Sequence, residues 1–223
     1  MKKCRECGML SPDETIFCRI CGTKFPTNIS RSNRARFNRG YISEDFVTDA
    51  ENMEAVLDNP AILITDYDIS DVADILPLLG ETVRTGSQLL IIANTFEKVV
   101  ADTLAINKVR GTLSIGAVMA PAYGDRKKAM LMDISILTGG KVVSSDYGLE
   151  LKNATLSLCG KAQKVNITKD ETIIIGGYGS PKSIEERILQ LKKFASNTYS
   201  DFDREKTQER LIELFGCMES EVC

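Results

Sequence analysis

Apolar and polar positions along this chain fall into two patterns, short continuous apolar runs and longer stretches with helical periodicity. The runs at 61–65 and 89–93 are mostly aliphatic and only five residues long, which is typical of buried strands. Between them, residues 70–85 repeat apolar side chains at spacings of three and four. This spacing predicts an amphipathic helix that ends at Gly86. The order of strand, helix and strand predicts an α/β domain.

The same alternation continues toward the end of the chain. The remaining predicted helices cover residues 96–109, 125–137, 181–195 and 200–215, and the remaining predicted strands cover residues 112–120, 141–144, 164–167 and 171–175. Pro181 fits the first turn of a helix, and Ser200 followed by Asp203 has the spacing of a capping box. Residues 217–223 are expected to form a frayed tail.

Two Cys-x-x-Cys-Gly repeats stand at the beginning of the chain. Cys4 and Cys7 form the first pair, Cys18 and Cys21 form the second, and ten residues separate the pairs. Each pair can direct two thiolates at one ion, so the four cysteines predict a closed tetrahedral site that holds a structural Zn²⁺. A redox pair would need a thioredoxin-like context, and iron in a rubredoxin-like site remains the minority alternative. We therefore expect a zinc ribbon over residues 1–26 that folds around its metal.

A polar, turn-rich stretch follows the ribbon. Its composition predicts a linker over residues 27–36, which separates the ribbon from an α/β domain at 37–216. Arg31, Arg34 and Arg36 in this stretch could contact nucleic acid, but a solvated linker is the preferred interpretation.

The composition restricts both the compartment and the chemistry. The 223 residues carry a formal net charge of −3, which argues against a general nucleic-acid binder. No apolar run reaches the length of a membrane-spanning helix, and the N-terminus lacks the apolar stretch of a secretory signal, so we expect a cytoplasmic protein. The chain contains no histidine, which excludes Ser-His-Asp triads, Cys-His pairs and histidine metal ligands.

Several segments of the α/β domain resemble one known family. The segments are Arg-Phe-Asn-Arg-Gly-Tyr-Ile-Ser at 36–43, Ile-Leu-Pro-Leu-Leu at 75–79, Ala-Pro-Ala-Tyr-Gly-Asp-Arg-Lys-Lys-Ala-Met-Leu at 120–131 and Ser-Asp-Phe-Asp-Arg-Glu-Lys-Thr-Gln-Glu-Arg at 200–210. Together they resemble the apical domain of group I chaperonins, the GroEL family, over residues 35–216. The resemblance implies a swivelling β/β/α domain with flanking helices.

The resemblance also implies a binding site. In this family the apical domain holds non-native polypeptides, and the mobile loop of a co-chaperonin, in an apolar groove between two helices. The positions that match the groove are Tyr41, Ser43, Phe46, Leu76, Leu79, Ala101, Ala105 and Ile106. The family has an aromatic residue where this chain has Asp45, and larger aliphatic residues in place of Ala101 and Ala105. These departures imply a groove that is weaker or retuned for one partner.

The ATP-binding domain of that family has no counterpart in this sequence. Gly140-Lys141 is followed by Val142, so no P-loop is completed there. We therefore expect no enzyme, but an ATP-independent, chaperone-like module that holds apolar segments of client or partner polypeptides. The alternative is a zinc-ribbon adaptor for nucleic acid or for one dedicated protein, with the α/β domain as its scaffold. Nucleic-acid binding would reveal itself by a steep salt dependence.

Overall fold

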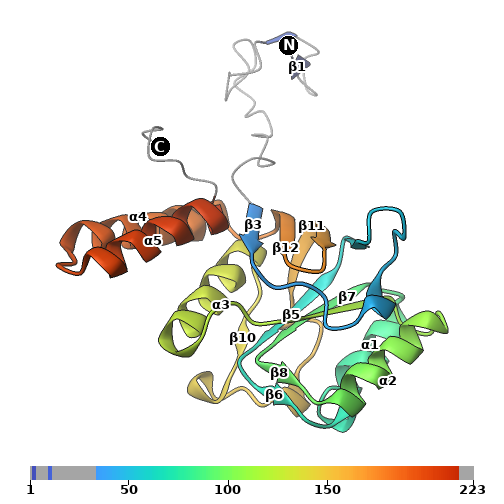
Figure 1. Ribbon diagram of the computed structural model, residues 1–223. Coiled ribbons are helices and arrows are strands. Elements are labelled where there is room, and N and C mark those ends of the chain that lie inside the picture. The colour runs from blue at the N-terminus through green and yellow to red at the C-terminus, as the bar shows by residue number, and fades with distance from the viewer. Residues whose placement is uncertain (1, 4–9, 12–33, 216–223) are drawn as a thin grey trace. The chain divides into compact units, whose positions relative to one another are not determined.

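The computed structural model describes residues 2–3, 10–11 and 34–215 and divides the chain into two units, Met1–Arg31 and Ser32–Cys223 (Figure 1). In the first unit, β1 (Lys2–Lys3) pairs antiparallel with β2 (Leu10–Ser11). The predictions that fall outside the described residues are the zinc ligands Cys4, Cys7, Cys18 and Cys21, linker residues 27–33 and the tail at 217–223.

One mixed sheet organises the second unit (Figure 1). Its strands follow the order β3-β12-β11-β5-β7-β9, with β10 paired to β5 and β4 paired to β11. The strands are β3 (Arg34–Phe37), β4 (Ala55–Asp58), β5 (Ala61–Thr65), β7 (Leu89–Ala93), β9 (Ile115–Met119), β10 (Val142–Val143), β11 (Gly160–Ile167) and β12 (Thr172–Gly177). β10, β5, β7 and β9 are parallel, whereas β4, β11, β12 and β3 pair antiparallel.

Five helices surround this sheet in the described part of the chain. They are α1 (Leu76–Thr85), α2 (Lys98–Val109), α3 (Gly124–Thr138), α4 (Pro181–Asn197) and α5 (Asp201–Phe215). Right-handed crossovers from β5 to β7 and from β7 to β9 place α1 and α2 on one face, and the return from β9 to β10 places α3 on the other. Figure 1 shows this separation, with α4 and α5 beside α3. The α/β class predicted from the sequence is confirmed.

The central strands explain why the apolar runs are continuous. All five residues of β5 and all five of β7 are buried, and the strands pair in register from Ala61 opposite Leu89 onward. A parallel strand with helices on both faces of its sheet has no solvent side, so no polar alternation is needed.

The helix predicted from residue 70 begins later than expected. Asp71 caps a separate 3₁₀ turn, η3 (Val72–Asp74), by accepting a hydrogen bond from the Ala73 N–H. Ile75 then leaves helical geometry, and α1 starts at Leu76. The predicted end is confirmed, because Gly86 adopts a left-handed conformation with φ 64° and its N–H bonds back into the last turn.

Two strands of the mixed sheet are missing from the sequence prediction. β3 begins at Arg34, inside the segment expected to be a linker, and pairs antiparallel with β12. Ala35 and Phe37 are buried while Arg34 and Arg36 are exposed, so the arginines belong to the outer side of a strand. β4 pairs with β11 and was likewise not predicted.

A buried ion-pair cluster joins α3 to the C-terminal helix pair. The Asp133 carboxylate on α3 has no solvent exposure and accepts from Arg187 Nε on α4 at 2.7 Å. It also accepts from Arg210 on α5, at 3.1 Å from Nε and 2.5 Å from Nη2. One carboxylate therefore holds two guanidinium groups and docks both helices against the domain.

Candidate functional site

The segment at 38–47 runs along the edge of the sheet and borders the candidate site. Tyr41 forms an isolated antiparallel bridge with Val118 of β9, and the Ile42 N–H donates to the Ala117 carbonyl at 3.1 Å. Gly40 lies so close to the turn after β11 that an added Cβ would fall 1.8 Å from the Lys169 carbonyl oxygen. Only glycine fits this approach, which brings the segment against the turn after β11.

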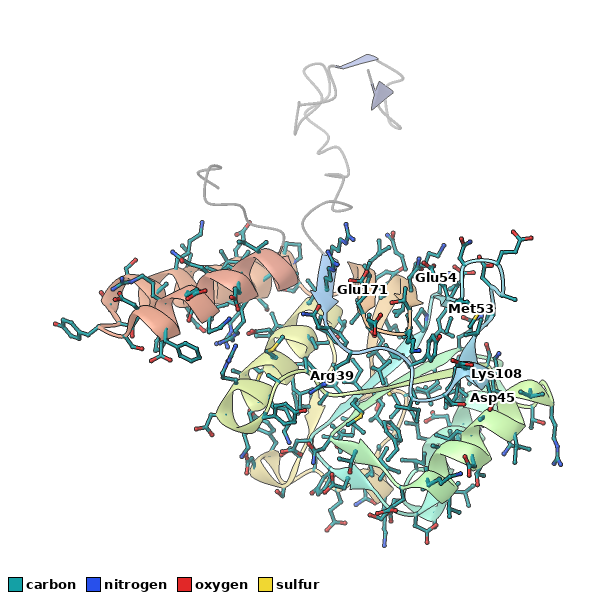
Figure 2. The ribbon with its side chains drawn as sticks, viewed as in Figure 1. Arg39, Asp45, Met53, Glu54, Lys108 and Glu171 are labelled. Carbon is teal, nitrogen blue, oxygen red and sulfur yellow. The ribbon has the colours of Figure 1, made fainter. Side chains whose placement is uncertain are left out.

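The end of this segment is fixed against α2. Phe46, in the short turn η2 (Glu44–Phe46), is fully buried, and Lys108 Nζ on α2 donates to the Val47 carbonyl at 2.5 Å. Burial lowers the pKa of Lys108, and the neighbouring Asp45 carboxylate opposes that shift. Figure 2 shows Asp45 and Lys108 next to each other. The Asp45 carboxylate is therefore beside a cation.

Helix α1 exposes two large apolar side chains on one side. Leu76 is 59% exposed and Val83 is 50% exposed, whereas Leu78 and Leu79 are buried. The two exposed residues are seven positions apart, which places them on the same face of the helix. Gly80 lies between them, and an added Cβ there would meet nothing within 4 Å, so this face is open.

Helix α2 carries a pair with the same spacing, and its last residue, Val109, is a third exposed aliphatic side chain. Val99 is 75% exposed and Ile106 is 49% exposed, again seven positions apart, while Val100, Leu104 and Ala105 are buried. Because α1 and α2 follow successive crossovers on one face of the sheet, the two pairs lie on neighbouring helices (Figure 1). We call the four side chains Leu76, Val83, Val99 and Ile106 the α1–α2 face.

A pocket of about 840 Å³ lies between the 38–47 segment and the beginning of α2. Its size falls within the roughly 300–1,000 Å³ of ordinary binding pockets. Apolar lining comes from Ile42, from Met119 at the end of β9 and from Phe96 of the short strand β8 (Thr95–Phe96), which pairs with β6 (Asp68–Ile69). Tyr41, Ser43 and Ala101 also line it, and we call it the Tyr41 pocket.

The structure separates the eight predicted groove residues into three groups. Leu76 and Ile106 are on the α1–α2 face, and Tyr41, Ser43 and Ala101 line the Tyr41 pocket. The remaining three, Phe46, Leu79 and Ala105, are at most 6% exposed and belong to the hydrophobic core. The surface role expected of these three is therefore corrected, because their side chains point inward from α1, α2 and η2.

Sequence reasoning missed Val83 and Val99 as surface residues. Each lies seven positions from a predicted groove residue on the same helix, Val83 from Leu76 and Val99 from Ile106. That spacing was the available signal. It could not by itself distinguish an exposed pair from a buried one, because both α1 and α2 also carry inward apolar residues.

Two findings concern metal ligands and thiols among the described residues. Among residues 2–3, 10–11 and 34–215, no cluster of three or more cysteine, aspartate or glutamate side chains is arranged to hold a metal ion. Cys159 is buried, and burial raises the pKa of its thiol to about 12, so the reactive thiolate is suppressed. No helix in this part of the chain combines the length and apolar character needed to cross a membrane.

No protein-family model matches the chain. The class that the fold and the candidate site define is an α/β domain with an exposed apolar face on two neighbouring helices.

Proposed function

We propose that the domain at 37–216 binds apolar segments of other polypeptides on the α1–α2 face, as an ATP-independent, chaperone-like module. The observation that carries the proposal is the exposure of four large aliphatic side chains in two matched pairs on neighbouring helices. Large apolar side chains that gather on an exposed surface mark interaction sites, and grooves beside helices accept peptides through apolar anchors. The resemblance to the chaperonin apical domain supports the same interpretation.

The free energy available from burying the α1–α2 face suits weak, reversible binding. Fully burying one large aliphatic side chain contributes roughly 1.5–3 kcal/mol. These four side chains are between 49% and 75% exposed, so only that part of their surface remains to be buried. Association also costs translational, rotational and side-chain freedom, which offsets much of that gain. We therefore expect micromolar or weaker affinity for single segments, and tighter holding of chains that present several segments.

The test uses one labelled peptide and three forms of the full chain. The peptide carries leucine at alternating positions, and its binding is followed by fluorescence anisotropy. The double variant Leu76→Asp, Ile106→Asp should bind at least about tenfold more weakly, because each carboxylate would have to be desolvated against apolar groups. Leu189→Asp is the matched control, since Leu189 on α4 is 57% exposed and lies outside the α1–α2 face. Equal affinities of the double variant and the wild type would contradict the proposal.

We further propose that Cys4, Cys7, Cys18 and Cys21 hold one structural Zn²⁺. The paired Cys-x-x-Cys-Gly spacing supports this, and a closed four-thiolate site leaves no open position for catalysis. In this account the metal orders its own segment and the holding function belongs to the α/β domain.

A further inference from the structure

Arg39 borders the Tyr41 pocket and is held in place at both its backbone and its side chain. Its N–H donates to the Phe37 carbonyl at 2.9 Å, and its own carbonyl accepts from the Thr172 hydroxyl at 2.6 Å. The side-chain Nε donates to the Ala120 carbonyl at 3.3 Å, and the guanidinium carbon lies 5.1 Å from the centre of the Tyr123 ring. Arg39 is thus half-buried and positioned before any ligand arrives (Figure 2).

This arginine differs from the other anchored arginines in having no carboxylate partner. Arg187 and Arg210 pair with Asp133, and Arg36 pairs with Glu171. Within the part of the chain that the structure describes, no carboxylate lies within ion-pair distance of Arg39, and its side chain contacts the Ala120 carbonyl and the Tyr123 ring instead. Its two terminal nitrogens keep the planar fork that matches a carboxylate.

The charges around the Tyr41 pocket favour an anionic ligand group. The lining carries the cations Arg39, Lys98 and Lys169 and the carboxylates Asp102 and Asp170. Lys98 and Asp102 pair with each other at 2.9 Å, which leaves Arg39 and Lys169 against Asp170. The lining therefore has one surplus positive charge, next to the apolar side chains of Ile42, Phe96 and Met119.

We propose that the Tyr41 pocket recognises an acidic side chain of the bound polypeptide, with Arg39 as its carboxylate receptor. The occupant is a peptide segment in which Asp or Glu stands next to a large apolar residue, so that the carboxylate meets the guanidinium while the apolar neighbour covers Phe96 and Met119. This rests on the proposed polypeptide binding and adds a sequence preference to it. The pocket opens between the beginning of α2 and the 38–47 segment, and Val99 of the α1–α2 face stands on that same first turn of α2.

The experiment changes the peptide as well as the protein. Three labelled peptides differ at one position, which is Glu, Gln or Lys beside a leucine, and each is titrated against the full chain by fluorescence anisotropy. The Glu peptide should bind about tenfold more tightly than the Gln peptide, since hydrogen bonds to charged groups are the stronger ones. Arg39→Gln should remove this preference, and Arg39→Lys should restore part of it. Arg84→Gln is the control, because Arg84 is an exposed arginine of α1 that does not line the pocket.

The outcomes distinguish the Arg39 proposal from the proposed polypeptide binding. Equal affinity of the Glu and Gln peptides for the wild-type chain would overturn the Arg39 proposal and leave polypeptide binding intact. If the wild-type chain bound none of the peptides, or if the Leu76→Asp, Ile106→Asp change left peptide binding unaffected, the proposed function would be contradicted instead. Binding of N-acetylglutamate alone as tightly as the Glu peptide would contradict a polypeptide occupant. The peptide substitution leaves the protein untouched, so the comparison does not depend on the folding of any variant.

Discussion

Replacing Asp133 by asparagine should lower the free energy of unfolding of the α/β domain by about 3–5 kcal/mol. The carboxylate is fully buried and holds Arg187 at 2.7 Å and Arg210 at 2.5 Å, and those two side chains are themselves only 21% and 13% exposed. Asparagine keeps one acceptor oxygen but places an amide donor against the second guanidinium. Two largely buried cations would then lose their compensating charge, which costs far more than losing an exposed pair.

Urea denaturation monitored by circular dichroism measures this effect. The matched control is Glu186→Gln, which removes the exposed Lys182–Glu186 pair on α4 and should change stability by no more than about 0.5 kcal/mol. Hydrogen exchange should also rise in α4 and α5, because Asp133 docks both helices. A loss under about 1 kcal/mol for Asp133→Asn, or a loss equal to that of the control, would show that Asp133 does not hold α4 and α5 against the domain.

Four further outcomes follow from the same structure. Phe46→Ala should cost about 3–5 kcal/mol in urea unfolding because it empties a core position, whereas Leu76→Ala should change stability by no more than about 0.5 kcal/mol; equal losses would contradict the division between core and surface. Peptide mapping after iodoacetamide at pH 8 should leave Cys159 unmodified until urea is added, because burial raises its pKa from 9.0 to about 12. For the same reason its contribution to stability should be complete below pH 9 and decline as the pH rises toward 12, since the unfolded chain loses the thiol proton first. Atomic absorption should find one zinc per chain, and a chelator should remove it without changing the thermal unfolding of the α/β domain; a metal-free chain would contradict the ribbon.

Much of the sheet can be predicted from the sequence because its centre is buried on both faces. β5 and β7 have the bounds that their apolar runs predict, because each run is buried along its whole length. β3 could not be recognised, because its two outward arginines give it the composition of a linker and only its pairing with β12 reveals a strand. The late start of α1 also depends on a local detail, the capping of η3 by Asp71.

The candidate site was predictable only in part. The apolar stripe of α1 includes Leu76, Leu78 and Leu79, and sequence periodicity cannot tell which of them faces the sheet. The orientation of α1 in the fold decides this, because Leu78 and Leu79 are buried in the core while Leu76 is exposed to solvent. The sequence likewise does not indicate that Arg39 is a binding residue. Its side chain is positioned by Ala120 and Tyr123, which lie far along the chain and come next to it only in the fold.

The most direct test of the central claim is to find where a bound peptide lies. A photoreactive benzophenone group can replace one leucine of the labelled peptide, and the cross-linked residues of the full chain can be mapped by mass spectrometry. We expect cross-links in α1, α2 and the 38–47 segment that unlabelled peptide competes away and that the Leu76→Asp, Ile106→Asp variant lacks. Competed cross-links confined to α4 and α5, or to residues 1–31, would contradict this expectation.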